Sequence, residues 1–231
     1  MGDHQYEPMM SPEYAATLAQ WHETTSIELH ALGHHRVSYL GLELVIPEHV
    51  FPPTPTSDLL GRAVLDDVRE SDRVLDMGTG SGVNAILAAS RSHEVIGVDI
   101  NPHAVAAATA NADRNGVAAR TRFAMSDLFD AVDGTFDVII IDPPFRWFAP
   151  RDLLELSFAD ENYRTLTRFM TEVPDRLNPG GRLLLFFGTS GDMNYLQHLI
   201  GQTALRAETI ASRDLTKEGI TVTYQTFRLT R

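Results

Sequence analysis

Four consecutive residues near the middle of the chain, Asp142-Pro143-Pro144-Phe145, combine the groups needed to hold a planar nitrogen group. They follow the run Val138-Ile139-Ile140-Ile141, which is apolar throughout, as expected of a central strand covered on both faces. Consecutive prolines cannot continue a strand ladder, so they stiffen the chain as it leaves the sheet. A fixed carboxylate then stands beside an aromatic platform. We therefore expect the catalytic site to comprise Asp142, Pro143, Pro144 and Phe145.

An earlier segment, Val74 to Gly82, has the pattern of a strand that runs into a glycine-rich turn. Glycines allow positive φ and close approach of a ligand, so this turn can cradle a nucleoside-bearing molecule. The spacing is G-x-G-x-G, with Val83 where a dinucleotide fingerprint has its third glycine. An acid one residue before the turn suits a cationic ligand better than a pyrophosphate. The cofactor-binding residues expected here are Asp76, Gly78, Thr79, Gly80 and Gly82.

Two further acids follow later strands. Asp99 ends the run Val95 to Val98, where it can accept hydrogen bonds from both ribose hydroxyls of an adenosine, although a surface carboxylate at a strand end is the alternative. Ser126-Asp127-Leu128-Phe129 follows the next strand, where an acid can accept from the adenine amino group, although polar residues are also ordinary in loops. We expect the cofactor site to include Asp99, Ile100, Asp127 and Leu128.

Together these motifs resemble class I S-adenosylmethionine-dependent methyltransferases, especially HemK-type N-methyltransferases, from about Val37 to the C-terminus. In that family the glycine-rich turn and the two acids bind S-adenosyl-L-methionine, and S-adenosyl-L-homocysteine is the product. HemK-type enzymes also carry a proline-containing loop before the core helix, as residues 47–58 do here, and finish with an antiparallel strand pair. The resemblance implies a methyltransferase.

The tetrad departs from the HemK pattern, which is usually Asn-Pro-Pro-Tyr and acts on a glutamine amide of a translation release factor. An aspartate-headed tetrad is similar to enzymes that methylate the exocyclic amine of adenine or guanine, including small ribosomal-RNA guanine methyltransferases. The resemblance therefore implies N-methylation of a planar amino or amide group, in a protein glutamine or a nucleobase.

Two alternatives remain beside this reading. A small metabolite as acceptor is supported by the acidic surface and by Phe145, Trp147 and Phe148 near the expected cleft. A cofactor-binding protein that stabilises a partner and has no activity of its own is the other. A dehydrogenase is disfavoured by the glycine spacing.

The elements that position these motifs alternate between short apolar runs and helical segments from Arg73 onward. This alternation indicates an α/β fold with a doubly wound, mostly parallel sheet, and the resemblance implies seven strands in a Rossmann-like arrangement with an antiparallel C-terminal hairpin. The expected strands are 74–75, 95–98, 121–124, 138–141, 183–187, 205–212 and 220–229, with a strand or hairpin over 37–46. The expected helices are 58–68, 83–91, 102–115, 160–177 and 193–202.

Residues 1–36 are expected to form a short helical extension, and residues 37–231 the methyltransferase domain. Ser11-Pro12-Glu13 is typical of a helix start, and Tyr14, Leu18 and Trp21 then recur at helical spacing, as in a helix that packs on the main domain or covers it as a lid. The extension is too short to replace the recognition domain of bacterial HemK enzymes. Shorter relatives work with a small partner protein, so the resemblance allows for a partner subunit.

Histidines at 30, 34 and 35 lie close in sequence, but a metal site needs further ligands and support that the sequence does not offer, so a solvated helix end is favoured and no metal is expected. The net charge of −12, from 31 acidic and 19 basic residues, disfavours extended nucleic-acid binding. Arginines downstream of the tetrad leave room for a positive rim around a cleft, namely Arg146, Arg151, Arg164 and Arg168.

The chain has no cysteine, which excludes disulfides, thiolate metal ligands and cysteine nucleophiles. It also has no apolar stretch of about 18 to 20 residues and no basic and apolar leader at the N-terminus. We therefore expect a protein without membrane contact that works in the cytoplasm.

Overall fold

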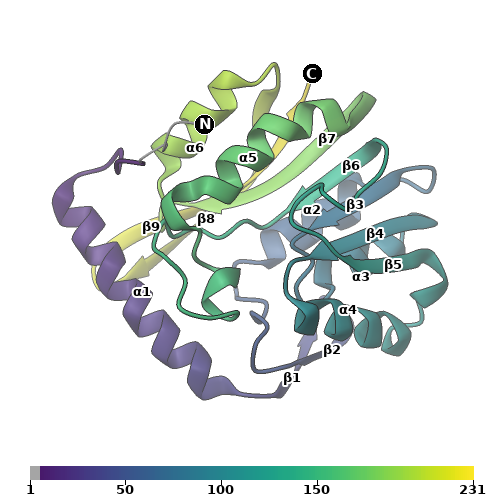
Figure 1. Ribbon diagram of the computed structural model, residues 1–231, viewed down its shortest axis with the longest axis horizontal. Helices are drawn as coiled ribbons and strands as arrows, with labels where there is room; N and C mark the ends of the chain where they lie inside the picture. The colour runs from purple at the N-terminus through teal and green to yellow at the C-terminus, as the bar shows by residue number, and fades with distance from the viewer. Residues whose placement is uncertain (1–5) are drawn as a thin grey trace.

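The computed structural model, which describes residues 6–231, is built on one large mixed sheet (Figure 1). Its strands are β3 (Arg73–Met77), β4 (Glu94–Asp99), β5 (Thr121–Met125), β6 (Phe136–Ile141), β7 (Leu177–Gly188), β8 (Arg206–Lys217) and β9 (Ile220–Thr230). The strand order is β5-β4-β3-β6-β7-β9-β8. The first five pair in parallel, and β9 is antiparallel to both β7 and β8. The expected seven-stranded fold with a C-terminal hairpin is confirmed.

The order of the strands creates a switch point between β3 and β6. The chain builds outward from β3 to β4 and β5, then returns to the other side of β3 to form β6. Ligands in doubly wound sheets bind beyond the carboxyl ends of the strands at such a point. The glycine-rich turn after β3 and the tetrad after β6 therefore emerge side by side.

Helices cover both faces of the sheet (Figure 1). They are α2 (Asp58–Asp67), α3 (Val83–Ala89), α4 (Pro102–Arg114), α5 (Arg164–Glu172) and α6 (Met193–Gln202). In β6, Ile139 and Ile141 pack in the cluster that includes α5 and α6, while Val138 and Ile140 pack in the cluster that includes α2 and α3. The continuous apolar run of β6 is thus explained by burial on both faces.

The long helix α1 (Pro12–Leu32) lies along the left-hand side of the molecule in Figure 1, outside both helical layers. Ser11 caps it by accepting a hydrogen bond from the Tyr14 amide at 3.2 Å. Leu18 and Trp21 are buried, and the Trp21 indole donates to Glu218 at 2.9 Å. The expected packing of this helix on the main domain is confirmed.

A small hairpin follows α1, formed by β1 (His35–Tyr39) and β2 (Leu42–Ile46). It makes a sheet of its own, and β1 begins before residue 37, where the extension was expected to end. The Asn111 side chain of α4 bonds both backbone groups of Val45, at 2.9 and 3.0 Å. The hairpin is therefore attached to the outer helices and not to the main sheet.

A helix and a strand differ in extent from the expectation. The helix predicted over residues 160–177 is limited to α5, because Asn162 and Tyr163 adopt left-handed backbone conformations, with φ of 56° and 50°. At its other end the chain tightens into a 3-10 turn, Val173–Arg176, which contains Pro174. The strand expected from Leu183 in fact begins at Leu177.

Candidate active site at the carboxyl edge of the sheet

The side chain of Asp76 supports the glycine-rich turn after β3 through hydrogen bonds. Its carboxylate is buried and accepts hydrogen bonds from the Thr79 hydroxyl at 2.7 Å and the Ala85 amide at 3.0 Å. Burial raises the pKa of Asp76 to about 6, and the nearby charge of Asp99 adds to the rise. Gly78, Gly80 and Gly82 all have positive φ. Asp76 thus fixes the shape of the turn and the start of α3.

Asp99 ends β4 and connects two neighbouring loops. One carboxylate oxygen accepts from the Gly80 amide and the other from the Asn101 amide, each at 2.9 Å. Burial raises the pKa of Asp99, although these backbone hydrogen bonds act in the opposite direction. Each carboxylate oxygen has more than one lone pair, so Asp99 retains acceptor capacity towards a ligand.

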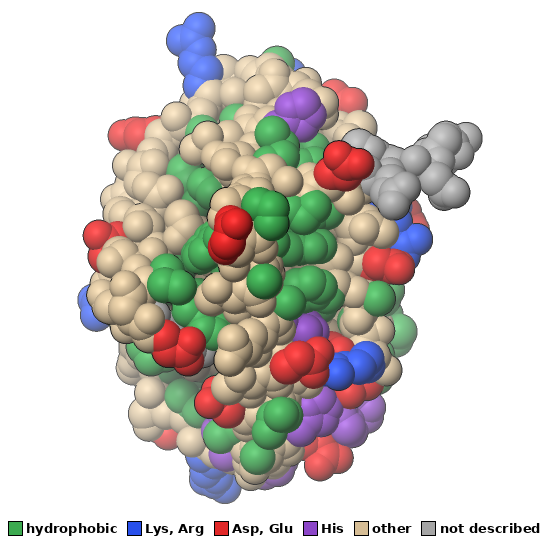
Figure 2. Space-filling view, turned by 90° about the vertical axis from the view of Figure 1, so that its left-hand side faces the viewer, with side chains coloured by type: hydrophobic (Ala, Val, Ile, Leu, Met, Phe, Trp, Pro, Cys, Tyr) green, Lys and Arg blue, Asp and Glu red, His purple; other side chains and the backbone are tan. Residues whose placement is uncertain are grey.

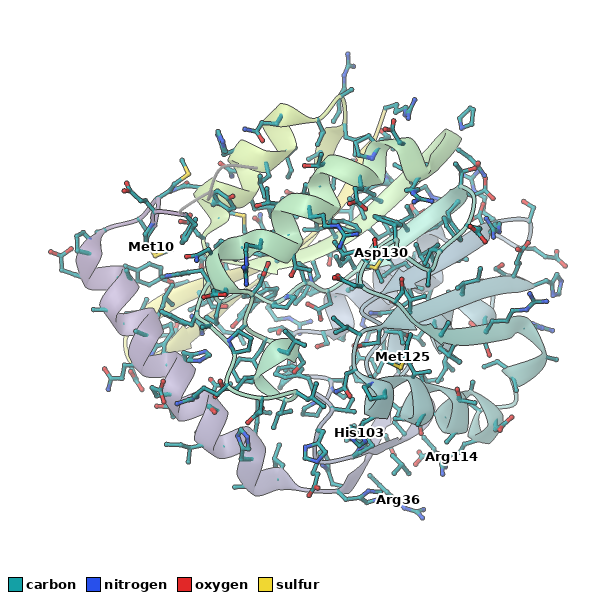
Figure 3. All side chains as sticks on the ribbon, viewed as in Figure 1. Met10, Arg36, His103, Arg114, Met125 and Asp130 are labelled. Carbon is teal, nitrogen blue, oxygen red and sulfur yellow. The ribbon has the colours of Figure 1, made fainter. Side chains whose placement is uncertain are left out.

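The loop after β5 is closed by Ser126, whose hydroxyl donates to the Leu128 carbonyl at 2.7 Å and accepts from the Ala131 amide at 2.9 Å. Leu128 is buried with a left-handed backbone. The Asp127 side chain is exposed and pairs with Arg168 at 3.3 Å. Figure 3 shows Met125 at the end of β5 and His103 near the start of α4, on the side of the sheet that faces α1.

In the tetrad, Asp142 stands out because no group within residues 6–231 donates a hydrogen bond to its carboxylate. Burial raises the pKa of Asp142 to about 7, and the charge of Asp76 adds to this rise. Phe145 packs against Phe187, with ring centroids 4.8 Å apart, and its carbonyl accepts from the Tyr163 hydroxyl. The tetrad is therefore rigid, while its carboxylate is free to accept from a ligand.

These groups surround a cavity of about 480 Å³. Pocket sizes of this order are typical of small-molecule and cofactor sites. Most of the residues expected to bind or react line it, namely Gly78, Thr79, Gly80, Asp99, Ile100, Asp127, Leu128 and all four tetrad residues. Asp76 and Gly82 do not line it but lie behind the turn, where a Cβ at Gly82 would stand 3.0 Å from Ala108.

Several lining residues carry no local sequence signal, because the fold alone brings them to the cavity. Thr25 comes from α1 and Tyr224 from β9, and apolar side chains from the loop after the tetrad include Leu156 and Phe158. The proline-rich loop, residues 50–57, also lines the cavity. In Figure 2 the face on which α1 lies carries hydrophobic side chains along its middle, with Asp and Glu side chains around them.

The expected rim of four arginines does not form. Arg146 is partly exposed and lines the cavity itself, while Arg151 pairs with Glu155 and Glu23. Arg164 and Arg168 likewise pair with acids of their own neighbourhood and do not line the cavity. The charges of Arg151, Arg164 and Arg168 are thus paired with the protein's own carboxylates, so the described residues form no basic rim at the cavity mouth.

The three histidines do not converge. Helix α1 ends at Leu32, so His34 lies beyond it, and the His35 ring bonds the Gly33 carbonyl at 2.9 Å. His30 bonds Asp152 at 2.9 Å. Within the described part of the chain, no three acidic or histidine side chains are grouped so as to hold a metal ion.

The comparison with protein-family models shows to which family the chain belongs. Residues 55–212 match the model of the methyltransferase small domain, a range that includes the glycine-rich turn, Asp99 and the tetrad. The chain belongs to this methyltransferase family. Its Asp142-Pro143-Pro144-Phe145 tetrad therefore lies within the part of the chain that the family model matches.

Curated relatives of this methyltransferase act on different acceptors. A Methanocaldococcus jannaschii protein, proposed to be a protein N5-glutamine methyltransferase, is 36% identical over 61% of this chain and 73% of its own length. A release factor glutamine methyltransferase of Agrobacterium fabrum is 34% identical over 49% of this chain and 42% of its own length. The ribosomal protein L11 methyltransferase of Thermus thermophilus is 32% identical over 78% of this chain and 59% of its own length. The chain therefore spans about half the length of the Agrobacterium and Thermus relatives.

Solved structures agree with the fold of this methyltransferase. The ribosomal protein L11 methylase of Lactobacillus delbrueckii subsp. bulgaricus superposes with a TM-score of 0.61 at 19% identity, covering 79% of this chain and 81% of that one. SMU.776, a proposed methyltransferase in complex with S-adenosylhomocysteine, superposes with a TM-score of 0.63 at 15% identity. The match covers 84% of this chain and 56% of that one. In addition, no helix within residues 6–231 has the length and apolar character needed to cross a bilayer.

Proposed function

We propose that this methyltransferase transfers the methyl group of S-adenosyl-L-methionine to the nitrogen of a planar amino or amide group held by Asp142. The observation that carries the proposal is a carboxylate without a protein donor that lines the same cavity as the glycine-rich turn. A partly buried acceptor that has no partner in the protein is free for a ligand, so its presence at the cavity wall points to a donor on the substrate.

The cofactor would lie between the turn after β3 and the loops after β4 and β5. Asp99 would accept from the ribose hydroxyls, while Ile100 and Leu128 present apolar surface to the adenine ring. Acids at 76, 99 and 142 give the site a negative potential, which suits the cationic sulfonium. The methyl donor in related enzymes and the neighbour in complex with S-adenosylhomocysteine support this assignment.

Methyl transfer is an in-line displacement, so the enzyme mainly aligns the acceptor nitrogen with the methyl group and excludes water. Asp142 would accept an N–H of the acceptor, orient the nitrogen lone pair and favour the positive charge that develops on nitrogen. Phe145 would support the planar group. The proton can leave after transfer, so no strong base is required.

The acceptors of the relatives indicate the kind of chemical group that is methylated, but they do not identify one substrate. Glutamine amides and exocyclic amines of nucleobases both present an NH₂ group to an acceptor such as Asp142. A small metabolite is favoured by one observation, because Thr25 of α1 and the apolar loop residues around Phe158 line the cavity and enclose it. We also propose residues 1–36 as the extension that carries this covering helix.

Two measurements test the proposal. Calorimetry should show binding of S-adenosylhomocysteine and no comparable binding of NAD; the opposite preference would remove the cofactor assignment. Asp142→Ala should reduce transfer of a labelled methyl group by at least about 100-fold while changing S-adenosylhomocysteine affinity by less than threefold. Unchanged turnover in this variant would remove its role, and cofactor binding with no turnover on any acceptor would favour a binding protein without activity.

A further inference from the structure

Arg146 directly follows the tetrad and is one of the residues that line the cavity. The residue is partly exposed, and the burial of its guanidinium lowers the pKa of that group. The side chain makes one hydrogen bond, from Nη1 to the Ser190 carbonyl. A guanidinium carries five N–H donors, so most of them have no acceptor from the described residues.

No acid among residues 6–231 lies within ion-pair distance of Arg146. The groups that face it are the phenols of Tyr14, Tyr163 and Tyr224, which are neutral at physiological pH. Arg182, which is buried, pairs with both Asp67 and Asp72. The described part of the chain thus gives Arg182 two counter-ions, whereas it gives Arg146 none.

Asp142 does not serve as that counter-ion. The groups that shift the pKa of Asp142 are its burial and Asp76, and the guanidinium of Arg146 is not one of them. The cavity therefore has an unpaired acid and an unpaired base on its wall, and the aromatic rings of Phe145 and Tyr224 line it as well. Buried charges without partners are destabilising, which is characteristic of binding sites rather than of structural cores.

We propose that Arg146 binds a carboxylate of the methyl acceptor, so that the substrate is a small planar amine or amide that also carries an acid group. This inference rests on the proposed function, because Asp142 must hold the nitrogen for Arg146 to hold the other end. The free edge of a guanidinium matches a carboxylate with two parallel N–H···O bonds. Arg146 is the cationic side chain among the described residues that line the cavity, which suits one carboxylate better than the several charges of a nucleic-acid backbone.

The test uses the full chain loaded with S-adenosylhomocysteine and a set of matched probes. The acids are 2-, 3- and 4-aminobenzoate and N-acetylglutamine, and the neutral counterparts are the corresponding carboxamides. Calorimetry should show at least one acid that binds about tenfold or more tightly than its carboxamide. Arg146→Gln should abolish this preference. Arg146→Lys should retain only part of it, because a lysine keeps the positive charge but cannot donate two parallel hydrogen bonds to one carboxylate.

Arg164→Gln is the matched control, since Arg164 is exposed, pairs with Glu161 and lies outside the cavity. It should keep the preference for the acid. The melting temperature of Arg146→Gln without ligand should be unchanged or higher than wild type, whereas a purely structural arginine would lower it on removal. Affinity for S-adenosylhomocysteine should stay within threefold, which separates this test from that of the cofactor site.

Three results would each overturn the proposal. The first is that no acid in the set binds better than its carboxamide. The second is that Arg146→Gln keeps the preference. The third is a peptide glutamine or a nucleic acid that wild type and Arg146→Gln methylate equally well. Loss of S-adenosylhomocysteine binding in wild type would instead contradict the proposed function itself.

Discussion

The hydroxyl of Tyr163 donates a 2.5 Å hydrogen bond to the carbonyl oxygen of Phe145 and accepts another, of 2.8 Å, from the amide of Asp192. Asp192 in turn accepts from the Tyr6 hydroxyl at 2.6 Å and caps α6 through the Tyr195 amide. The tetrad is thus connected to both the N-terminal segment and α6 by one buried phenol. Its position depends on residues that are distant in sequence.

Tyr163→Phe should show what this connection contributes. Removal of the hydroxyl leaves the ring packing in place but frees the Phe145 carbonyl, so we expect turnover to fall about five- to tenfold, with stability lowered by about 1 kcal/mol. Cofactor affinity should not change, and kcat should fall more than KM rises. The control is Tyr195→Phe, which removes a buried hydroxyl that bonds Thr167 instead of the tetrad. Equal losses in both variants would contradict a positioning role.

Asp142 should make the ligand-free protein less stable as the pH rises. Its pKa is about 7 in the folded state, above the ordinary value of 3.8, so folding favours the protonated form. Its stabilising contribution is complete below about pH 4 and is lost as the pH rises through 7. Asp142→Asn should therefore be about 1 to 2 kcal/mol more stable than wild type at pH 8 and similar at pH 4.5. Chemical denaturation at both pH values measures this, with the exposed Asp113→Asn as control; a constant difference would contradict it.

Affinity for the methyl donor should depend on pH more than affinity for the product does. The donor has a cationic sulfonium and the product a neutral thioether, and ionised Asp76 and Asp142, with pKa values of about 6 and 7, favour the cation. Between pH 5.5 and 8 the affinity for S-adenosylmethionine should rise about five- to tenfold relative to S-adenosylhomocysteine. Calorimetry at four pH values checks the ratio. Asp142→Asn should flatten it, and an unchanged slope in that variant would assign the effect to other groups.

Glu155 should determine how firmly helix α1 packs on the rest of the protein at low pH. It is buried and accepts from the Ser26 hydroxyl at 2.6 Å and the Arg151 amide at 2.8 Å. Burial raises its pKa, but the hydrogen bonds from Arg151 and Ser26 outweigh this and lower it to about 2. This stabilising contribution is present above the ordinary pKa of 4.5 and is lost as the pH falls towards 2.

Glu155→Gln should accordingly lower the free energy of unfolding by about 2 kcal/mol at pH 7, and the difference from wild type should narrow below pH 4. Limited proteolysis within α1 should also become faster. Glu161→Gln, which removes an exposed ion pair with Arg164, is the control and should change stability by less than about 0.5 kcal/mol. A loss independent of pH would mean that Glu155 acts through packing instead of charge.

The sequence predicted those features that depend on neighbours along the chain. The apolar run of β6, the glycines of the turn and the acid at the end of β4 each follow from local pattern, and the fold places all of them at one edge. The burial of Arg146 and the pairing of Arg151 with Glu23 of α1 depend on contacts between distant segments, which local pattern does not contain. The same holds for Tyr224, which reaches the cavity because β9 pairs with β7. The late start of the helix expected from residue 160 depends on the left-handed backbone of Asn162 and Tyr163, and only the first of these is a residue type that commonly adopts this conformation.

Helix α1 leaves the ribosome well before the residues that it packs against, because these lie far downstream in the chain. It bonds Glu155, Thr189 and Glu218, and the last of these lies in the turn between β8 and β9. At about 5 to 20 residues per second, α1 waits on the order of 10 to 40 seconds for these partners to be made. An isolated helix of this length is marginal in water, so the cavity is closed only after the turn that contains Glu218 has been synthesised.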